Sequence, residues 1–273
     1  ILRSNGKGHV LCHNCGNYLC RFAWPALCLP AQFNVSPVVG AHGSRAHYGV
    51  PEMTSVKVET DDGLRLTSWY RPPANEDTLT LLYLHGNAGH IGYRADKVKP
   101  YLEAGYGMLL LSYRGYGTNP GYPTEDHLYL DSRAALKFLA DQHIPIFKTV
   151  IYGESLGTGV AVEVAQNLGI AGLVLEAPFS SMVDAAALHF KLFPTSLLVR
   201  DKYDSLSKIN NIKAPILIIH GKNDRTIPYS LGRKLYDMAP QPKEFYGIPN
   251  AGHNDLYDHG VAAKIIEYLE NNP

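Results

Sequence analysis

The chain has 273 residues, of which 45% are hydrophobic and 18% charged, a composition typical of a globular protein that can bury a substantial core. Its 25 Lys and Arg residues balance 25 Asp and Glu residues, so the charge provides no electrostatic footprint for nucleic acid, and no nucleic-acid partner is expected. Because no run of 18 apolar residues is present, we also predict no transmembrane helix in this sequence.

Residues 1–50 differ from the rest of the chain because they are rich in Gly, Cys, His and Asn and show little hydrophobic periodicity. They are predicted to form an irregular N-terminal extension, followed by one folded domain over residues 51–273. All four cysteines lie in the extension, at Cys12, Cys15, Cys20 and Cys28. The Cys12-x-x-Cys15 spacing suits a zinc site, but the later gaps do not repeat it, so we favour free thiols and expect neither a metal nor a cofactor.

From residue 51 onward the hydrophobic pattern is regular. The alternating runs Thr54–Thr60 and Leu64–Tyr70 flank a turn signal and predict an antiparallel hairpin. Short apolar runs predict six buried strands, at Leu79–Leu84, Met108–Tyr113, Thr149–Tyr152, Gly172–Leu175, Pro215–His220 and Lys243–Ile248. Amphipathic stretches predict helices at Thr124–Gln142, Leu156–Leu168, Leu231–Met238 and Ala262–Glu270. The sequence therefore predicts an α/β fold, with a mostly parallel eight-stranded sheet, an N-terminal antiparallel hairpin and helices on both faces.

A candidate nucleophile follows the strand Thr149–Tyr152, which runs into Gly153-Glu154-Ser155-Leu156-Gly157 just before a predicted helix. Gly-x-Ser-x-Gly between a strand and a helix is typical of a sharp turn that holds a serine hydroxyl above the sheet edge. Side chains at the two glycine positions would collide with neighbouring backbone. The alternative is that Ser155 only caps the helix, so its assignment as nucleophile depends on suitable partners.

A serine nucleophile needs a base, and the base needs an orienting acid. Active residues of parallel sheets lie at the carboxyl ends of the strands. His253 is the predicted base because it lies in the loop between the last strand and the last helix, whereas His220 lies inside a strand and is predicted to be structural. Asp224 follows the penultimate strand and is the predicted acid, with Glu176 at the end of the preceding strand as its rival.

Two backbone N–H groups are candidates for an oxyanion hole. The strand Leu79–Leu84 ends in His85-Gly86-Asn87-Ala88-Gly89, where Gly86 allows close backbone approach. We predict the N–H groups of Asn87 and Leu156 as the donors. His85 follows the strand directly and is predicted to make local hydrogen bonds rather than to act as a base.

The segment Ala185–Leu198 is rich in apolar residues and lies between two predicted strands. It is interpreted either as a small helical lid over an acyl pocket or as an ordinary packing helix. If it is a lid, the substrate pocket is predicted to be lined by Leu188, Phe190, Leu192 and Phe193.

Five motifs in chain order resemble the Bem46-like branch of the α/β-hydrolases, which is similar to the mammalian α/β-hydrolase-domain proteins. They are His85–Gly89, Tyr113–Gly117, Gly153–Gly157, Gly221–Asp224 and Gly252–Asp255. The resemblance runs from about residue 51 to the end of the chain and implies the α/β-hydrolase fold and a Ser–Asp–His triad. Many relatives begin with a membrane-anchor helix, but residues 1–50 do not resemble that segment. We therefore favour a cytoplasmic protein, and membrane association remains an alternative that only the resemblance implies.

The leading hypothesis is a serine hydrolase that cleaves small carboxylic esters with short to medium acyl chains through an acyl-enzyme. The alternatives are an acyl-protein thioesterase or depalmitoylase, an acylglycerol lipase, a serine peptidase and a non-catalytic binding protein on a hydrolase scaffold. A binding protein has no need of Ser155, Asp224 and His253 together, which argues against the last alternative. The sequence gives no indication of the oligomeric state.

Overall fold

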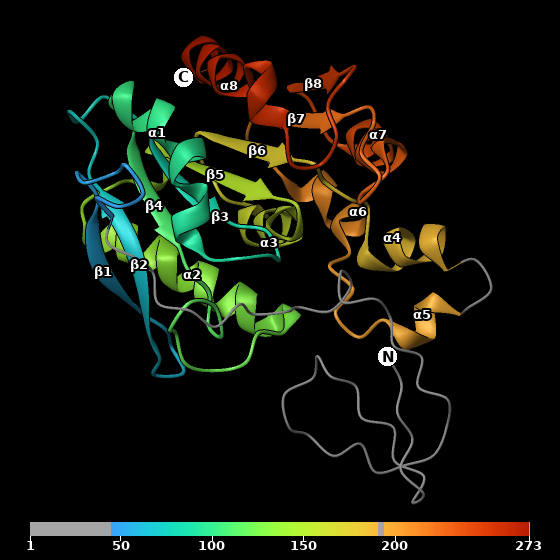
Figure 1. Cartoon of the computed structure of the whole chain (residues 1–273), viewed down its shortest axis with the longest axis horizontal. Coiled ribbons are helices and arrows are strands. Elements are labelled where there is room, and N and C mark those ends of the chain that lie inside the picture. Colours follow the sequence, from blue (N-terminus) through green and yellow to red (C-terminus); the bar gives the residue numbers. More distant parts are fainter. Residues whose placement is uncertain (1–44, 191–193, 273) are drawn as a thin grey trace, which may run out of the picture.

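The computed structural model describes residues 45–190 and 194–272. The four cysteines, and with them the Cys12-x-x-Cys15 spacing, lie outside the described residues. A sheet in the order β1-β2-β4-β3-β5-β6-β7-β8 runs through the molecule (Figure 1). Its strands are β1 (Thr54–Glu59), β2 (Arg65–Arg71), β3 (Thr80–Leu84), β4 (Gly107–Leu111), β5 (Thr149–Glu154), β6 (Gly172–Glu176), β7 (Ile216–Gly221) and β8 (Lys243–Ile248).

Strand directions follow the prediction. β1 pairs antiparallel with β2, and β2 pairs antiparallel with β4. All pairings from β4 through β3, β5, β6 and β7 to β8 are parallel. The mostly parallel sheet with an N-terminal antiparallel hairpin is therefore confirmed.

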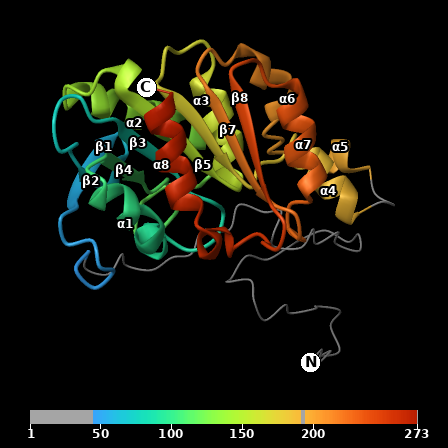
Figure 2. The ribbon, with the colours of Figure 1, turned by 90° about the horizontal axis from the view of Figure 1, so that it is seen from above.

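Helices cover both faces of the sheet (Figure 2). One face packs against α1 (Ala95–Glu103) and α8 (Val261–Asn271), and the other against α2 (Glu125–Asp141), α3 (Leu156–Ala165) and α7 (Tyr229–Met238). In β3, Leu82 and Leu84 belong to the core on the α2 side, whereas Leu81 and Tyr83 belong to the core on the α1 side. Both sets are buried because successive strand side chains point to opposite faces and each face carries helices.

The structure differs from the sequence prediction in two elements. Helix α1 was not predicted, and it contains Pro100 within its span. The segment 185–198, interpreted as either a helical lid or a packing helix, is not one helix: α4 (Met182–His189) and α5 (Thr195–Leu198) are separate short helices, and residues 191–193 are not described. A further short helix, α6 (Ser205–Lys208), precedes β7. Within the described ranges, no helix has the length and apolarity needed to span a bilayer.

Because the central strands are parallel, the loops that carry the candidate site residues lie at one edge of the sheet, formed by the carboxyl ends of these strands. Leu84 at the end of β3 is paired with Gly153 of β5, and Glu154 is paired with Glu176 at the end of β6. On the far side, Gly221 at the end of β7 is paired with Ile248 at the end of β8. The segments that follow these strands therefore meet above the same edge, as expected for an active site in an open α/β sheet.

Candidate active site

Ser155 sits on a strained turn between β5 and α3. Its backbone has φ 50° and ψ −114°, a conformation that non-glycine residues rarely adopt. A Cβ atom on Gly153 would lie 2.6 Å from the carbonyl oxygen of Gly157, and one on Gly157 would collide with the carbonyl oxygen of Leu84. The side chain of Ser155 makes no capping hydrogen bond to α3. The turn therefore presents the hydroxyl at the sheet edge instead of using it as a helix cap.

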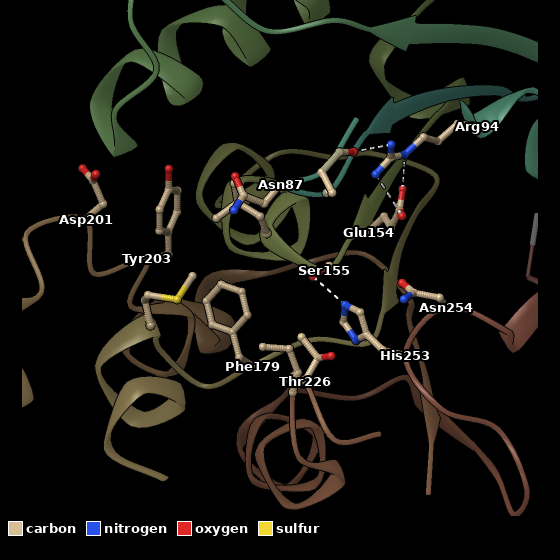
Figure 3. Close-up of a pocket in the computed structure, with 15 residues that line it drawn as sticks. Asn87, Arg94, Glu154, Ser155, Phe179, Asp201, Tyr203, Thr226, His253 and Asn254 are labelled. Carbon is tan, nitrogen blue, oxygen red and sulfur yellow. Dashed lines mark hydrogen bonds and ion pairs between the residues drawn. The ribbon is translucent and has the colours of Figure 1, made fainter. Parts of the chain in front are cut away.

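The structure brings Ser155, His253 and Asp224 into one hydrogen-bonded series (Figure 3 shows the first link). The distance from Ser155 Oγ to His253 Nε2 is 3.0 Å, and that from His253 Nδ1 to Asp224 Oδ2 is 2.7 Å. Because a carboxylate can only accept, the proton of the neutral imidazole lies on Nδ1. His253 Nε2 is then free to accept the hydrogen bond of the Ser155 hydroxyl.

The Asp224 carboxylate is held by several donors. Its Oδ1 accepts from the backbone N–H groups of Thr226 and Ile227, each at 2.8 Å, and its Oδ2 lies 3.3 Å from His220 Nε2. Burial alone would raise the pKa of Asp224, but the hydrogen bonds from His220 and His253 hold this pKa well below its ordinary value. Asp224 is therefore ionised and fixed in orientation. His220, which was predicted to be structural, is buried against the loop that carries Asp224.

The loop after β7, which carries Asp224, and the loop after β8, which carries His253, meet because their backbones are hydrogen-bonded to each other. The N–H of Lys222 donates to the carbonyl of Ile248, and that of Asn223 donates to the carbonyl of Ala251, each at 2.9 Å. A Cβ atom on Gly221 would collide with the carbonyl of Ala251, so only glycine permits this approach. Two adjacent loops at the ends of β7 and β8 thus carry Asp224 and His253 to each other.

Glu176, the rival acid, has other partners. Its carboxylate accepts from Lys97 Nζ at 2.7 Å and from the Tyr152 hydroxyl at 2.6 Å. Its side chain is fully buried at the end of β6, and its backbone carbonyl accepts the N–H of Ser155 at 2.8 Å. Asp224, and not Glu176, is therefore the carboxylate beside His253.

The residues predicted to supply the oxyanion donors line the same pocket as Ser155. Asn87 and Leu156 both line the pocket over the serine, and the Asn87 side-chain oxygen accepts from the Tyr116 hydroxyl at 2.8 Å. A Cβ atom on Gly86 would lie 3.3 Å from the Ser155 Cβ, so the loop after β3 packs closely on the turn. His85 is buried with Nδ1 2.7 Å from the carbonyl oxygen of Gly86, in agreement with a local role.

A pocket of about 220 Å³ opens over Ser155 (Figure 3). Its apolar wall is made by Leu156, Phe179, Met182, Tyr203 and Ile227, and its polar wall includes Asn87, Arg94, Glu154, Asp201 and Asn254. Among the described residues, no group of three or more His, Cys, Asp or Glu side chains is arranged to hold a metal ion.

Of the residues predicted to line the substrate pocket, the two that the structure describes, Leu188 and Phe190, are not on this wall. Leu188 is exposed on α4, and Phe190 is half-buried against the core. Leu192 and Phe193 lie outside the described residues. The apolar wall instead takes Phe179 from the loop after β6 and Met182 from the first turn of α4. No periodicity marks such loop residues in a sequence, although Glu154 and Asn254 did stand inside the motifs singled out above.

The comparisons with known proteins agree with this architecture. The sequence profile described as "alpha/beta hydrolase fold" matches residues 80–198. An uncharacterized protein of Mycobacterium tuberculosis is 38% identical, over 76% of this chain and 74% of its own length. Protein bem46 of Schizosaccharomyces pombe is 31% identical, over 87% of this chain and 85% of its own length.

A solved esterase of Pyrococcus furiosus superposes with a TM-score of 0.70 at 22% identity and covers 86% of this chain and 98% of its own. At that identity the likeness shows the fold. Together with the relatives above, it leads to one conclusion about ancestry. The chain belongs to the α/β-hydrolase family, in its Bem46-like branch.

Proposed function

We propose that the protein is a serine hydrolase that cleaves carboxylic esters with short to medium acyl chains. The observation that carries the proposal is the hydrogen-bonded series from Ser155 through His253 to Asp224 at the floor of a pocket. A nucleophile, a base and an orienting acid in this geometry are the arrangement that nucleophilic acyl transfer requires. The esterase fold neighbour from Pyrococcus furiosus adds support for this reaction class.

In the proposed reaction, Ser155 Oγ attacks the ester carbonyl carbon while its proton passes to His253 Nε2. Asp224 keeps the imidazole in the required tautomer and stabilises its positive charge. The carbonyl oxygen becomes an oxyanion, which accepts hydrogen bonds from the backbone N–H groups of Asn87 and Leu156. The N-terminus of α3 adds a positive dipole end at the same place.

The tetrahedral intermediate then expels the alcohol, which takes the proton from His253 Nε2, and an acyl group stays bound to Ser155. A water molecule, deprotonated by His253, attacks this acyl-enzyme and releases the carboxylic acid. Both halves of the reaction use only side chains and backbone groups of this chain, so the proposed mechanism requires no cofactor.

Pocket size supports the proposed acyl length. The volume of about 220 Å³ lies below the roughly 300–1,000 Å³ common for sites of drug-sized ligands. Phe179, Met182 and Ile227 offer apolar contact for a few methylene groups, each contributing at most about 0.8 kcal/mol when buried. Carbons beyond the end of the pocket remain in water and add nothing. We therefore expect activity to be highest for roughly four to eight acyl carbons.

The test is a substrate series of p-nitrophenyl esters from acetate to palmitate, with an acyl-thioester and an aminoacyl amide beside them. We expect kcat/KM to peak at short or medium chains and to vanish in Ser155→Ala. A steady rise through palmitate would indicate a lipase, and preference for the thioester would indicate a depalmitoylase. Failure to turn over any of the substrates would favour a binding protein and contradict the proposal.

A further inference from the structure

A buried ion pair lies directly beside the proposed nucleophile. Arg94 ends the short 3₁₀ helix Ile91–Arg94, which follows the loop 85–89 with the predicted oxyanion donor. Its Nε lies 3.0 Å from Oε2 of Glu154 and its Nη2 lies 3.3 Å from Oε1 (Figure 3). Glu154 is the residue before Ser155, and the two side chains are 9% and 13% exposed. The pair thus joins the loop after β3 to the turn after β5.

The same guanidinium also holds the backbone of the oxyanion loop. Arg94 Nη1 donates to the carbonyl oxygen of Ala88 at 2.5 Å. Ala88 is the residue after Asn87, whose N–H is the proposed oxyanion donor. The next residue, Gly89, has φ 75°, a left-handed conformation that glycine adopts without strain. One planar side chain therefore fixes a carbonyl of the loop with one edge and the carboxylate beside Ser155 with the other.

Charge balance keeps this arrangement ionised. Lys97 Nζ lies 3.2 Å from Glu154 and 2.7 Å from Glu176, and the Tyr83 hydroxyl donates to Glu154 at 3.0 Å. Burial acts to raise the pKa of Glu154, but the charges of Lys97 and Arg94 outweigh it and hold this pKa well below its ordinary value. Among the described residues around the turn, the positive charges of Arg94 and Lys97 thus balance the negative charges of Glu154 and Glu176.

Stability alone is a weak reason for such a cluster. The desolvation cost of buried ions is large, and well-packed apolar side chains are often as stable in their place. Geometric precision is a better reason. An arginine offers several donors in a rigid fork, so it can bind a carboxylate and a carbonyl at once in fixed directions, which a lysine cannot do. A displacement of about 1 Å in an active site can cost a hundredfold in rate.

We infer that Arg94 is a positioning residue for the hydrolytic reaction, an inference that rests on the function proposed above. It holds the loop that carries the Asn87 N–H against the turn that carries Ser155 and Leu156. The two donor N–H groups then converge on one oxyanion. Arg94 acts through the carboxylate of Glu154 and the carbonyl of Ala88, to which its guanidinium is hydrogen-bonded.

The test compares Arg94→Gln and Arg94→Lys with a matched control, Arg71→Gln. Arg71 also donates to backbone carbonyls, those of Leu102 at 2.6 Å and Tyr106 at 3.4 Å, but it is paired with Met108 near the start of β4, at the opposite edge of the sheet. For each variant, kcat and KM for p-nitrophenyl butyrate and the thermal midpoint are measured.

We expect Arg94→Gln to lower kcat about 10- to 100-fold with KM within about threefold, because oxyanion contacts form fully only in the transition state. Arg94→Lys should fall between Arg94→Gln and the wild type, and Arg71→Gln should keep its kcat. The Lys variant carries the test if Arg94→Gln does not fold. A folded variant of either kind with wild-type kcat would overturn the inference.

A double variant separates positioning from charge. Arg94→Gln together with Glu154→Gln removes both charges of the pair but does not restore the rigid set of donors that Arg94 provides. Positioning predicts that kcat stays low in the double variant, whereas its return to the wild-type value would show that only the unbalanced carboxylate mattered and would overturn the inference. If the wild-type protein hydrolyses no ester, the proposed function has failed, which is a different result from an active wild type with unaffected Arg94 variants.

Discussion

Asp224 follows β7 and Glu176 ends the neighbouring strand β6, yet of the two only Asp224 is hydrogen-bonded to His253. Asp224→Asn should lower kcat about 10³- to 10⁴-fold, because the amide no longer selects the Nδ1–H tautomer or stabilises the imidazolium. Glu176→Gln is the matched control, and its main effect should be on the thermal midpoint, since it leaves Lys97 with one carboxylate fewer. Steady-state kinetics and thermal unfolding of both variants check this. The opposite ranking of kcat would mean that the acid has been misassigned.

Some site residues can be predicted from sequence because their chemistry and their place after a strand coincide. Ser155, Asp224 and His253 each follow an apolar run, and their order along the chain matches the order that acyl transfer uses in this fold. Arg94 had no such signal. Its role depends on a carbonyl and a carboxylate that only the folded chain brings within reach.

At the scale of elements, close packing between β3 and α3 fixes the position of the turn that carries Ser155. Gly157→Ala would direct a methyl group at the carbonyl of Leu84, so β3 or α3 must shift. We expect a loss of about 1–3 kcal/mol in the free energy of unfolding, with a large loss of activity. Denaturant unfolding and ester kinetics measure the two effects.

Gly169→Ala is the control for this change, because a Cβ atom there meets nothing within 4 Å. It should leave both the stability and the activity close to those of the wild type. Equal effects of the two substitutions would contradict the packing argument, since they would show that backbone freedom and not the contact with β3 is what matters.

The sequence predicted the central strands, whose residues are buried, and it failed for helix α1, in which buried and exposed residues are mixed. The buried strands stand out as apolar runs because helices cover both faces of the sheet. Helix α1 was missed because Pro100 reads as a helix breaker and because Lys97, which faces the carboxylates of Glu154 and Glu176, disturbs the apolar pattern. Leu188, near the end of α4, was predicted as a pocket residue in place of Met182 in its first turn, because apolar content alone does not distinguish Leu188, which is exposed, from Met182, which lines the pocket.

At the scale of the whole molecule, paired carboxylates predict sensitivity to acid. Hydrogen bonds from Arg114 lower the pKa of Asp62 to about 2, and the pKa values of Glu154 and Asp224 are also lowered. In the unfolded chain the pKa values of carboxyl groups are about 4. Their contribution to stability is therefore present above about pH 4 and is lost as the pH falls through the lower folded values.

We expect the thermal midpoint to fall steeply between about pH 4 and pH 2, and Asp62→Asn to be less stable at neutral pH with a shallower fall in acid. Asp77→Asn is the control, because the Asp77 side chain is fully exposed in its ion pair with Lys148 and is screened by solvent. Circular dichroism melts across this pH range give the measurement. An Asp62 variant with the wild-type profile would contradict the expectation.

Removal of residues 1–44 tests the proposed division of the chain into an extension and a catalytic domain. The cut leaves Val50 and Met53 in the core and Tyr48 in contact with His90. Since the sheet, Ser155 and its partners all come later in the chain, kcat/KM should stay within about threefold of that of the full chain. Loss of activity on removal, or on treatment of the full chain with a zinc chelator, would assign a structural role to the cysteine segment.

The proposed mechanism depends on Ser155 as the nucleophile, and covalent labelling identifies the nucleophile directly. The wild-type protein is treated with a fluorophosphonate, digested, and mapped by mass spectrometry, with Ser155→Ala treated in parallel. We expect a single phosphonyl adduct on Ser155 and none on the variant, whose thermal midpoint should show that it remains folded. An adduct on another residue, or undiminished labelling of Ser155→Ala, would contradict this mechanism.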